Sequence, residues 1–421
     1  MPLNSGKCII LTAIEEELKD RHQDRVGIAV SGGSDSIALL HAVSVYSKNT
    51  HIHISTATVD HGLRNEAKAE ANFCAKFAHE LGVEHDILCI KNWNLNKNLQ
   101  DQARTLRYEL LTEWAHKKNL SLILTAHTAN DQAETVLMRL ARAAGADGLA
   151  GIPHCRELNG ITILRPLLRV FRGDLREYLR HRNIHWVEDS SNNDQRFERV
   201  RARETLAILE RFGLTTKALV DVASNLTQVK SALAWYTQLE VKALMRVDNG
   251  DILINREDFY KLPKEMKRRL LVRVLLWIGG GVYPPRRNSV NNVLNAITEI
   301  RNITLNGCIL LHQGDDVRLC REFQAVQDVV SSINDIWDRR WRFSGSVSKS
   351  QDVIIRALRE DGLRQCPNWH QTGRPRLALL ASPSVWEGTK LIFAPQAGLK
   401  GPWEFELVEQ DVDFYSKDIL D

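Results

Sequence analysis

One segment constrains the fold of this chain more than any other: an apolar run that leads through a glycine- and serine-rich turn directly into a second apolar run. The first run is Val26–Val30, the turn is Ser31–Gly32–Gly33–Ser34–Asp35–Ser36, and Ile37–Leu40 follows. This order predicts a strand, a tight loop and a helix. The glycines let the backbone turn sharply, and the N–H groups that open the helix, with the serine hydroxyls, can bind phosphate.

The residues of this turn narrow the kind of ligand further. The turn lacks the Gly-Lys-Ser/Thr ending of a Walker A loop and the third glycine of a dinucleotide-binding fingerprint. It contains a carboxylate, Asp35, which is stable beside phosphates only when a cation such as Mg²⁺ lies between them. The alternative is an ordinary Gly-Ser turn that joins a strand to a helix and binds no ligand.

The surrounding segment, about the first 190 residues, alternates short apolar runs with helical patterns. Apolar residues recur at helical spacing from Ala67 to Leu81, and Gly82 is placed to end that helix. Such alternation predicts an α/β fold, in which a parallel sheet carries helices on both faces and binds ligands at the carboxyl ends of its strands. The expected strands are Val26–Val30, His51–Asp60, Val83–Ile90, Leu120–Ala126 and Ile161–Leu164.

The pattern changes after residue 213. Apolar residues from Leu219 to Tyr236 alternate by three and four, as on one face of a long helix, and a second helical stretch runs from Pro263 to Ile278. Short runs that resemble strands follow: Val353–Ala357, Leu377–Ala381 and Leu391–Ala394. We therefore expect a catalytic α/β domain at 1–213, a helical domain at 214–330 and a small domain with β-strands at 331–421.

Composition excludes several other classes of protein. The 56 Lys and Arg residues nearly balance 52 Asp and Glu residues, which leaves a net charge of +4. No stretch approaches the roughly 20 apolar residues that span a bilayer, and the N-terminus lacks a signal-peptide pattern, so we expect a cytoplasmic protein without a membrane partner. The seven cysteines include no C-x-x-C pair, which argues against a disulfide framework or a zinc site.

The loop and several further motifs resemble one family. Ser-Gly-Gly-x-Asp-Ser resembles the pyrophosphate loop (PP-loop) of the N-type ATP pyrophosphatases, which cleave ATP between the α and β phosphates. The later motifs narrow the resemblance to the tRNA(Ile)-lysidine synthetases. They are Val59–Arg64, Ala103–Tyr108, Thr125–Thr135, Gly148–Ile152, Leu164–Leu168, Glu188–Asn192 and Arg199–Arg203.

This resemblance implies an activity. The family adenylates C2 of the wobble cytidine in an isoleucine tRNA with a CAU anticodon, and lysine then displaces AMP to give lysidine. The expected cofactors are ATP, as a co-substrate, and Mg²⁺, and the expected partners are this tRNA and L-lysine. The resemblance assigns phosphate binding to the loop residues Ser31, Gly32, Gly33, Ser34, Asp35 and Ser36.

The same resemblance names catalytic residues. Asp35 and Asp131 would hold Mg²⁺, and Glu134, one helical turn past Asp131, would hold the lysine ammonium group. Arg199 and Arg203 would stabilise phosphate charge. The alternative for the two acidic residues is a capping box with Asp131 as N-cap and Glu134 at N3. His61 and His127 follow strands, where a structural role is as common as a catalytic one.

The sequence departs from the family pattern at four places. Asn130 stands where the family commonly has Asp, and Thr128 stands where a second His is often found. Ala143–Ala144 replace the usual Gly-Ser, and Val200 replaces an Asn between the two arginines.

Basic segments in the last two domains indicate a tRNA-binding surface. Residues 261–273 hold six Lys and Arg residues and one acidic residue, and residues 337–342 combine three arginines with two tryptophans. Such residues bind phosphates and stack on bases, and the last domain is expected to contact the acceptor side of the tRNA. The alternative for each segment is a solvated helix face with its aromatic residues in the core.

Two rival functions remain open. One is a PP-loop tRNA thiolase, which generally requires paired cysteines or a cysteine-bound iron–sulfur cluster. The other is a non-catalytic tRNA-binding protein on the same fold.

Overall fold

The computed structural model describes residues 8–21, 23–62, 66–90, 99–188, 195–281, 283–345, 353–408 and 414–415. The chain divides into two compact units, Met1–Lys230 and Ser231–Asp421, and the boundary lies within the long helix α9 (Thr216–Leu244). The predicted domain limits at 213/214 and 330/331 stay predictions. No helix within the described ranges is long and apolar enough to cross a membrane.

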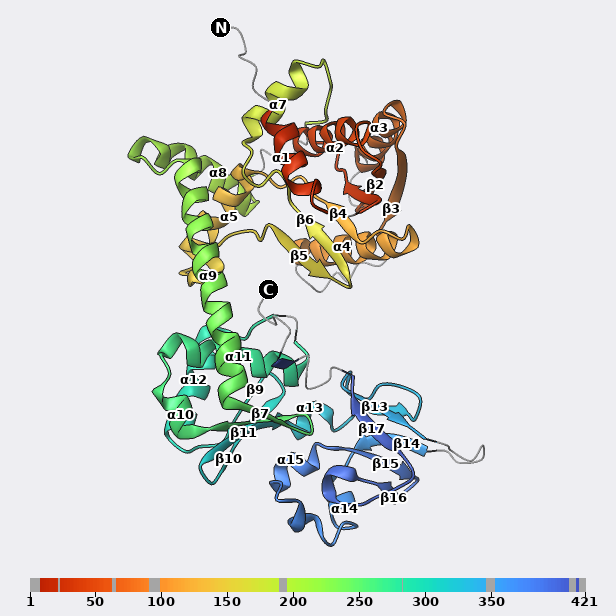
Figure 1. Cartoon of the computed structure of the whole chain (residues 1–421), viewed down its shortest axis with the longest axis vertical. Coiled ribbons are helices and arrows are strands. Elements are labelled where there is room, and N and C mark those ends of the chain that lie inside the picture. The colour runs from red at the N-terminus through yellow and green to blue at the C-terminus, as the bar shows by residue number, and fades with distance from the viewer. Residues whose placement is uncertain are drawn as a thin grey trace. The chain divides into compact units, whose positions relative to one another are not determined.

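The first unit is built on a six-stranded sheet in the order β3-β2-β1-β4-β6-β5 (Figure 1). All neighbouring strands pair in parallel except the β5–β6 hairpin, so the α/β prediction is confirmed. The strands are β1 (Arg25–Ala29), β2 (His53–Asp60), β3 (Glu84–Cys89), β4 (Leu122–Leu124), β5 (Cys155–Leu158) and β6 (Ile161–Leu164). They coincide with the predicted strands to within a few residues at each end, and β5 was not predicted.

Helices cover both faces of this sheet because successive residues of a strand point to opposite faces. On one face Val26 and Ile28 pack with helices α1, α2, α3 and α7, whereas Ala29 packs on the opposite face with helix α4. The helices of this unit are α1 (Ile9–Leu18), α2 (Ser34–Ser47), α3 (Glu66–Glu80), α4 (Leu99–Lys117), α5 (Ala129–Ala141), α6 (Ala146–Leu149), α7 (Arg172–Arg180) and α8 (Glu198–Leu209), followed by the 3₁₀ turn Glu210–Phe212. Gly82 follows α3 with a φ of +72°, as the predicted helix end requires.

The second unit contains more β-structure than the sequence predicted. Helices α10 (Arg256–Lys261), α11 (Lys264–Gly279) and α12 (Arg287–Thr298) occur within 214–330, and the long helix and α11 were expected. The same segment also forms a five-stranded sheet, β7-β8-β11-β10-β9, which the prediction of a helical domain did not include. Its strands are β7 (Met245–Asp248), β8 (Asp251–Asn255), β9 (Ile303–Leu305), β10 (Cys308–Gln313) and β11 (Asp316–Arg321). These strands are three to six residues long and bounded by tight turns, so the sequence shows only brief alternation.

The C-terminal part of the second unit carries two small antiparallel sheets, β12-β14-β15-β16 and β13-β17. The predicted strands at 353–357 and 391–394 are present, whereas the expected strand Leu377–Ala381 is helix α15, whose Leu379 and Leu380 pack in a small core with Leu358 and Trp386. The elements are α13 (Phe323–Val326), β12 (Val330–Ser332), β13 (Trp341–Ser344), β14 (Val353–Ala357), α14 (Arg359–Leu363), the 3₁₀ turn Trp369–Thr372, α15 (Arg376–Leu380), β15 (Pro383–Glu387), β16 (Lys390–Phe393), the 3₁₀ turn Pro395–Ala397 and β17 (Glu404–Leu407).

Several basic and aromatic residues that were expected on a tRNA-binding surface lie inside this unit. Arg269 is 1% exposed and pairs with Glu265, and Arg273 is 2% exposed and donates to the carbonyl oxygen of Phe414. Trp337 and Trp341 are core residues. The local sequence of α11 explains the error, because Arg269 and Arg273 belong to an otherwise apolar stretch, Arg269–Ile278, in which every residue is buried.

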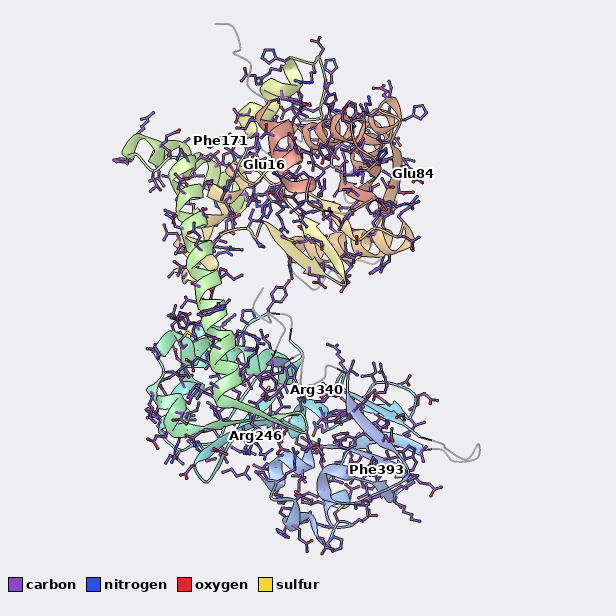
Figure 2. All side chains as sticks on the ribbon, viewed as in Figure 1. Glu16, Glu84, Phe171, Arg246, Arg340 and Phe393 are labelled. Carbon is purple, nitrogen blue, oxygen red and sulfur yellow. The ribbon has the colours of Figure 1, made fainter. Side chains whose placement is uncertain are left out.

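Arg340, labelled in Figure 2, is also buried and belongs to a network of charged residues. It donates to the carbonyl oxygen of Gly250, and Arg318 lies 2.8 Å from carboxylate oxygens of both Asp248 and Asp251. Arg374 also pairs with both aspartates. Buried arginines of this kind are stable because carboxylates and carbonyl oxygens surround them. They connect the five-stranded sheet to the C-terminal segment within this unit.

The close packing of Gly27 against helix α4 yields a test of the fold. A Cβ atom at position 27 would lie 2.8 Å from the Trp114 ring, whereas none of the described atoms lies within 4 Å of a Cβ at Gly173 in α7. We expect Gly27→Ala to lower the free energy of unfolding by about 1–3 kcal/mol through overpacking. Gly173→Ala, the control, should leave it unchanged or raise it by up to about 1 kcal/mol. Urea unfolding of the two variants measures this, and equal stability would contradict the packing of β1 on α4.

Candidate active site

A pocket of about 710 Å³ opens at the carboxyl ends of β1, β2 and β4 in the first unit. Strand order reverses between β1 and β4, because the chain moves outward to β2 and β3 and then returns to the other side of β1. This is the position where doubly wound sheets bind ligands. The described lining residues that carry the argument are Ser31, Ser34, Asp35, His127, Asp131 and Arg172.

The glycine- and serine-rich loop forms the floor of this pocket. Gly32 has a φ of +83°, and its carbonyl oxygen accepts a hydrogen bond from Val187 N at 2.9 Å. The Ser36 hydroxyl accepts from Ser31 N at 3.1 Å and donates to Gly33 O at 3.0 Å, which fixes the turn. Helix α2 starts at Ser34 with Gly33 as N-cap and without a side-chain cap among the described residues. Its first N–H groups can therefore bind an anion.

Helix α5 starts differently, and its cap positions Asp131. Thr128 is the N-cap, and its backbone N–H and hydroxyl both donate to Asp131 Oδ2 at 2.8 Å. The capping box is therefore Thr128 with Asp131 at N3, so the alternative reading with Asp131 as N-cap and Glu134 at N3 was wrong. Because Oδ2 accepts both bonds, Oδ1 of Asp131 is directed to a different partner.

That partner is Arg172, which the sequence analysis missed. Its Nε lies 2.9 Å from Asp35 Oδ2, and another guanidinium nitrogen lies 3.2 Å from Asp131 Oδ1. A third contact, of 3.6 Å, reaches Glu134 Oε1. One half-buried guanidinium group thus joins three carboxylates from helices α2 and α5. Arg172 is the first residue of α7 and directly follows Phe171, which is labelled in Figure 2.

The two aspartates respond differently to this environment. Burial raises the pKa of Asp35 above its usual value, although Arg172 acts in the opposite direction. Burial would also raise the pKa of Asp131, but the Arg172 charge and the hydrogen bonds from Thr128 outweigh it and lower the pKa. The difference follows from the cap, because among the described residues Asp35 accepts hydrogen bonds from the Ser34 hydroxyl and Arg172 alone.

Glu134 lies behind the pocket wall and is 1% exposed. Its Oε1 accepts a hydrogen bond from Arg203 Nε at 2.9 Å. Within the described part of the chain, Oε2 is buried and has no hydrogen-bond partner. An unpaired carboxylate oxygen at this depth is costly, so it marks a place where a donor from a ligand can bind.

A basic wall faces the acidic cluster. Arg199 and Arg203 project from α8 and line the pocket, as does Arg107 of α4, whose pKa is lowered by burial and by Arg104 and Arg199 nearby. Arg107 lies within the matched motif 103–108, although the sequence analysis assigned it no role. The fold therefore brings the loop, the carboxylates and the arginines together around one pocket. Their chemical roles stay predictions.

His127 also lines the pocket and is held in its neutral form. Burial, together with the charges of Arg165, Arg107 and Arg199, lowers its pKa to about 3 against the opposing effect of Asp131. Its Nδ1 lies 3.0 Å from the Thr125 hydroxyl. A neutral imidazole in this position can donate or accept one hydrogen bond toward a ligand.

Two of the departures from the family pattern, Asn130 and Val200, lie at this site and are compatible with its contacts. Asn130 Oδ1 accepts a hydrogen bond from Arg172 N at 2.9 Å, and an amide provides the acceptor oxygen as well as a carboxylate does. Val200 is buried on the inner face of α8, whereas Arg199 and Arg203 line the pocket.

The donor atoms fit a magnesium ion that is shared with a substrate. No group of three or more His, Cys, Asp or Glu residues is arranged as a metal site in the described ranges. Mg²⁺ commonly needs only one or two carboxylates, because substrate phosphates and water complete its octahedron. Asp35 and Asp131, joined by one guanidinium beside an anion-binding loop, meet that requirement.

Comparison with known proteins places this site in a family. Residues 8–209 match the model of the PP-loop domain family. A tRNA(Ile)-lysidine synthase of Ruegeria pomeroyi is 44% identical over 416 residues, which are 99% of each chain. The chain belongs to the tRNA(Ile)-lysidine synthase family. A second family member, from Wolbachia pipientis wMel, is 36% identical and covers 80% of this chain and 81% of its own.

One solved structure is also similar. It is the U34-tRNA thiolase NcsA from Methanococcus maripaludis with its [4Fe-4S] cluster, at 14% identity and a TM-score of 0.46 over 52% of this chain and 78% of that chain.

The neutral state of His127 can be tested by NMR. An unperturbed histidine titrates near about 6.5, whereas burial should keep His127 uncharged down to about pH 3. The folded state should therefore lose stability relative to the unfolded state as the pH falls from about 6.5 toward 3, because only the unfolded histidine takes up a proton there.

Imidazole nitrogen shifts, assigned with a His127→Gln variant, should stay constant for His127 between pH 8 and pH 5. A midpoint near 6.5 would contradict the described burial.

Proposed function

We propose that this protein ligates L-lysine to C2 of the wobble cytidine in tRNA(Ile) with a CAU anticodon, and so forms lysidine. The first step transfers the adenylyl group of ATP to the cytidine O2 and releases pyrophosphate. In the second step the lysine amine displaces AMP. The observation that carries the proposal is one pocket, in a chain of this family, where an anion-binding loop lies beside an acidic cluster and a wall of arginines.

The loop side supports the ATP half of the reaction. The uncapped N–H groups at the start of α2 and the Ser31 and Ser34 hydroxyls would bind the phosphates that leave as pyrophosphate. Asp35 and Asp131 would hold Mg²⁺. When bound, this ion neutralises phosphate charge and polarises the phosphoryl group that is attacked.

The basic wall supports the same step from the opposite side. Arg199 and Arg203 lie on one face of α8, with Arg107 near them, so three guanidinium groups would surround the adenylyl phosphate. Preorganised cations of this kind stabilise charge that develops in the transition state. Neutral His127 would donate a hydrogen bond to an oxygen of the nucleotide or of the cytosine.

Glu134 supports the lysine half of the reaction. A lysine side chain has a pKa of about 10.4, so the site must bind an ammonium group and then accept its proton. Oε2 of Glu134 is a buried acceptor without a partner among the described residues and can meet the first need. Because Arg172 and Arg203 cover Glu134, lysine reaches it only when one of these side chains shifts.

Two observations weigh against the rival functions. None of the described lining residues is a cysteine, whereas a thiolase needs a cysteine near the activated base. The continuous network of loop, carboxylates and arginines weighs against a non-catalytic tRNA-binding protein.

The proposal includes a tRNA-binding surface, with fewer residues than the sequence predicted. In segment 261–273, Lys261 pairs with Asp258, Arg268 with Glu265, and Lys267 lies over the Tyr260 ring. The exposed Lys264 and half-buried Lys267 are the better candidates for phosphate contacts. Contact of 331–421 with the acceptor side and a cytoplasmic location remain part of this proposal.

Separate assays of the two steps test the assignment. Asp35→Asn should lower pyrophosphate release by about 10²-fold or more, because it removes a charge from the metal site. Glu134→Gln should raise the lysine concentration needed for half-maximal product, while adenylation of the tRNA survives better. Glu177→Gln, on the exposed face of α7, should change neither step.

The measurement follows adenylated tRNA and lysidine across a lysine titration. If Glu134→Gln abolishes adenylation and keeps the normal lysine dependence, Glu134 belongs to the ATP half of the reaction.

A further inference from the structure

Arg172 occupies the place among the carboxylates that a divalent cation must take. Its Nε and one terminal nitrogen donate to Asp35 Oδ2 and Asp131 Oδ1, so the guanidinium group lies between the two aspartates. The other oxygen of Asp35 accepts from the Ser34 hydroxyl and that of Asp131 accepts from Thr128, so a metal ion held by both aspartates would use the oxygens that Arg172 contacts. The guanidinium group and the ion therefore compete for one position.

We propose that Arg172 is an internal counter-cation, which holds the acidic cluster together before substrate binds and gives up Asp35 and Asp131 to the divalent cation. Arg172 is thus a positioning residue. The inference rests on the proposed metal role of the two aspartates.

The charges of the cluster require such a residue. Asp35, Asp131 and Glu134 have side-chain exposures of 18%, 13% and 2%, and all three contact the same guanidinium group. Three carboxylates that share one partner, one of them buried and two half-buried, repel one another, and a cation placed among them offsets that repulsion. The two aspartates raise the pKa of Arg172 above its usual value despite burial, so the guanidinium stays charged.

The anchoring of Arg172 allows its side chain to move without the backbone. Its backbone N–H donates to Asn130 Oδ1 at 2.9 Å, and Ala129 N donates to Val170 O at 3.0 Å, so α5 fixes the start of α7. The side chain itself is 19% exposed and faces the pocket. An arginine side chain has several rotatable bonds, so the guanidinium can leave the aspartates while its backbone stays in place.

The third contact determines where the guanidinium goes. Glu134 Oε1 lies 3.6 Å from Arg172 and contacts the guanidinium nitrogen that neither aspartate contacts. When a metal ion takes Asp35 and Asp131, Arg172 keeps this contact, and Oε2 of Glu134 remains as an acceptor. Metal binding at the two aspartates and the hydrogen bonding of Glu134 are thereby linked through the Arg172 side chain.

Binding of Mn²⁺ in the absence of nucleotide tests the proposal directly. Electron paramagnetic resonance measures unbound Mn²⁺ during titration of the full-length wild-type protein, Arg172→Gln and Arg172→Lys. Close charge pairs commonly contribute enough energy that removal of the competing cation should tighten Mn²⁺ binding about tenfold or more. Arg172→Lys, which keeps the charge but cannot bridge three carboxylates, should lie between the two.

Matched controls distinguish an error in the metal site from an error in the competition between Arg172 and the metal ion. Arg180→Gln makes the same charge change on α7 outside the pocket lining and should bind Mn²⁺ as the wild type does. Asp35→Asn should weaken binding strongly. If Asp35→Asn has no effect, the metal site itself is wrong. If Asp35→Asn weakens binding but Arg172→Gln binds no tighter than the wild type, the competition is wrong and the metal site stands.

A second measurement uses the wild-type protein and does not depend on how the variants fold. The Nε–H group of Arg172 donates to Asp35 in this structure, so its NMR signal should exchange slowly with solvent. Addition of Mg²⁺ should shift that signal and accelerate its exchange. An unchanged signal at a Mg²⁺ concentration that displaces bound Mn²⁺ would overturn the proposal.

Discussion

Three carboxylates, two half-buried and one buried, converge where helices α2 and α5 begin, and all three contact the guanidinium group of Arg172. The sheet brings the two helices together, because β1 and β4 are neighbours and each strand leads into one helix at its carboxyl end. The cap of α5 then orients Asp131, and the tight turn at Gly32 opens the start of α2. The anion-binding loop, the acidic cluster and the basic wall all depend on this one arrangement.

Much of this arrangement follows from local sequence. The strand, the loop around Gly32 and the helix were predicted because tight turns and apolar runs depend on neighbouring residues. The family resemblance, and not local sequence, assigned Asp35 and Asp131 to one site. Arg172 could not be found in this way. It is 137 residues from Asp35 in the chain, and only the folded sheet brings the two together. The acceptor Asn130, next to Asp131, gave no sign of the residue that it binds.

In the second unit, the sequence led to a wrong expectation about which residues are exposed. Counting charges predicted an exposed basic surface, but Arg269 and Arg340 are inside, where carboxylates or carbonyl oxygens pair with them. Arginine is well suited to such positions, because its planar group can satisfy several acceptors at once. Burial therefore separates the exposed from the structural members of a basic run: Lys264 is exposed, whereas Arg269 begins a continuously buried stretch of α11.

The central claim is that this pocket joins lysine to a cytidine of a tRNA, and the product itself tests that claim most directly. The wild-type protein would be incubated with a CAU-anticodon isoleucine transcript, ATP, Mg²⁺ and isotopically labelled lysine, and the tRNA digested for mass spectrometry of its nucleosides. The account predicts one cytidine per tRNA, at the wobble position, with the mass of lysine added and one water lost, and only when ATP is present. A transcript that remains unmodified, or a product that contains sulfur, would contradict it.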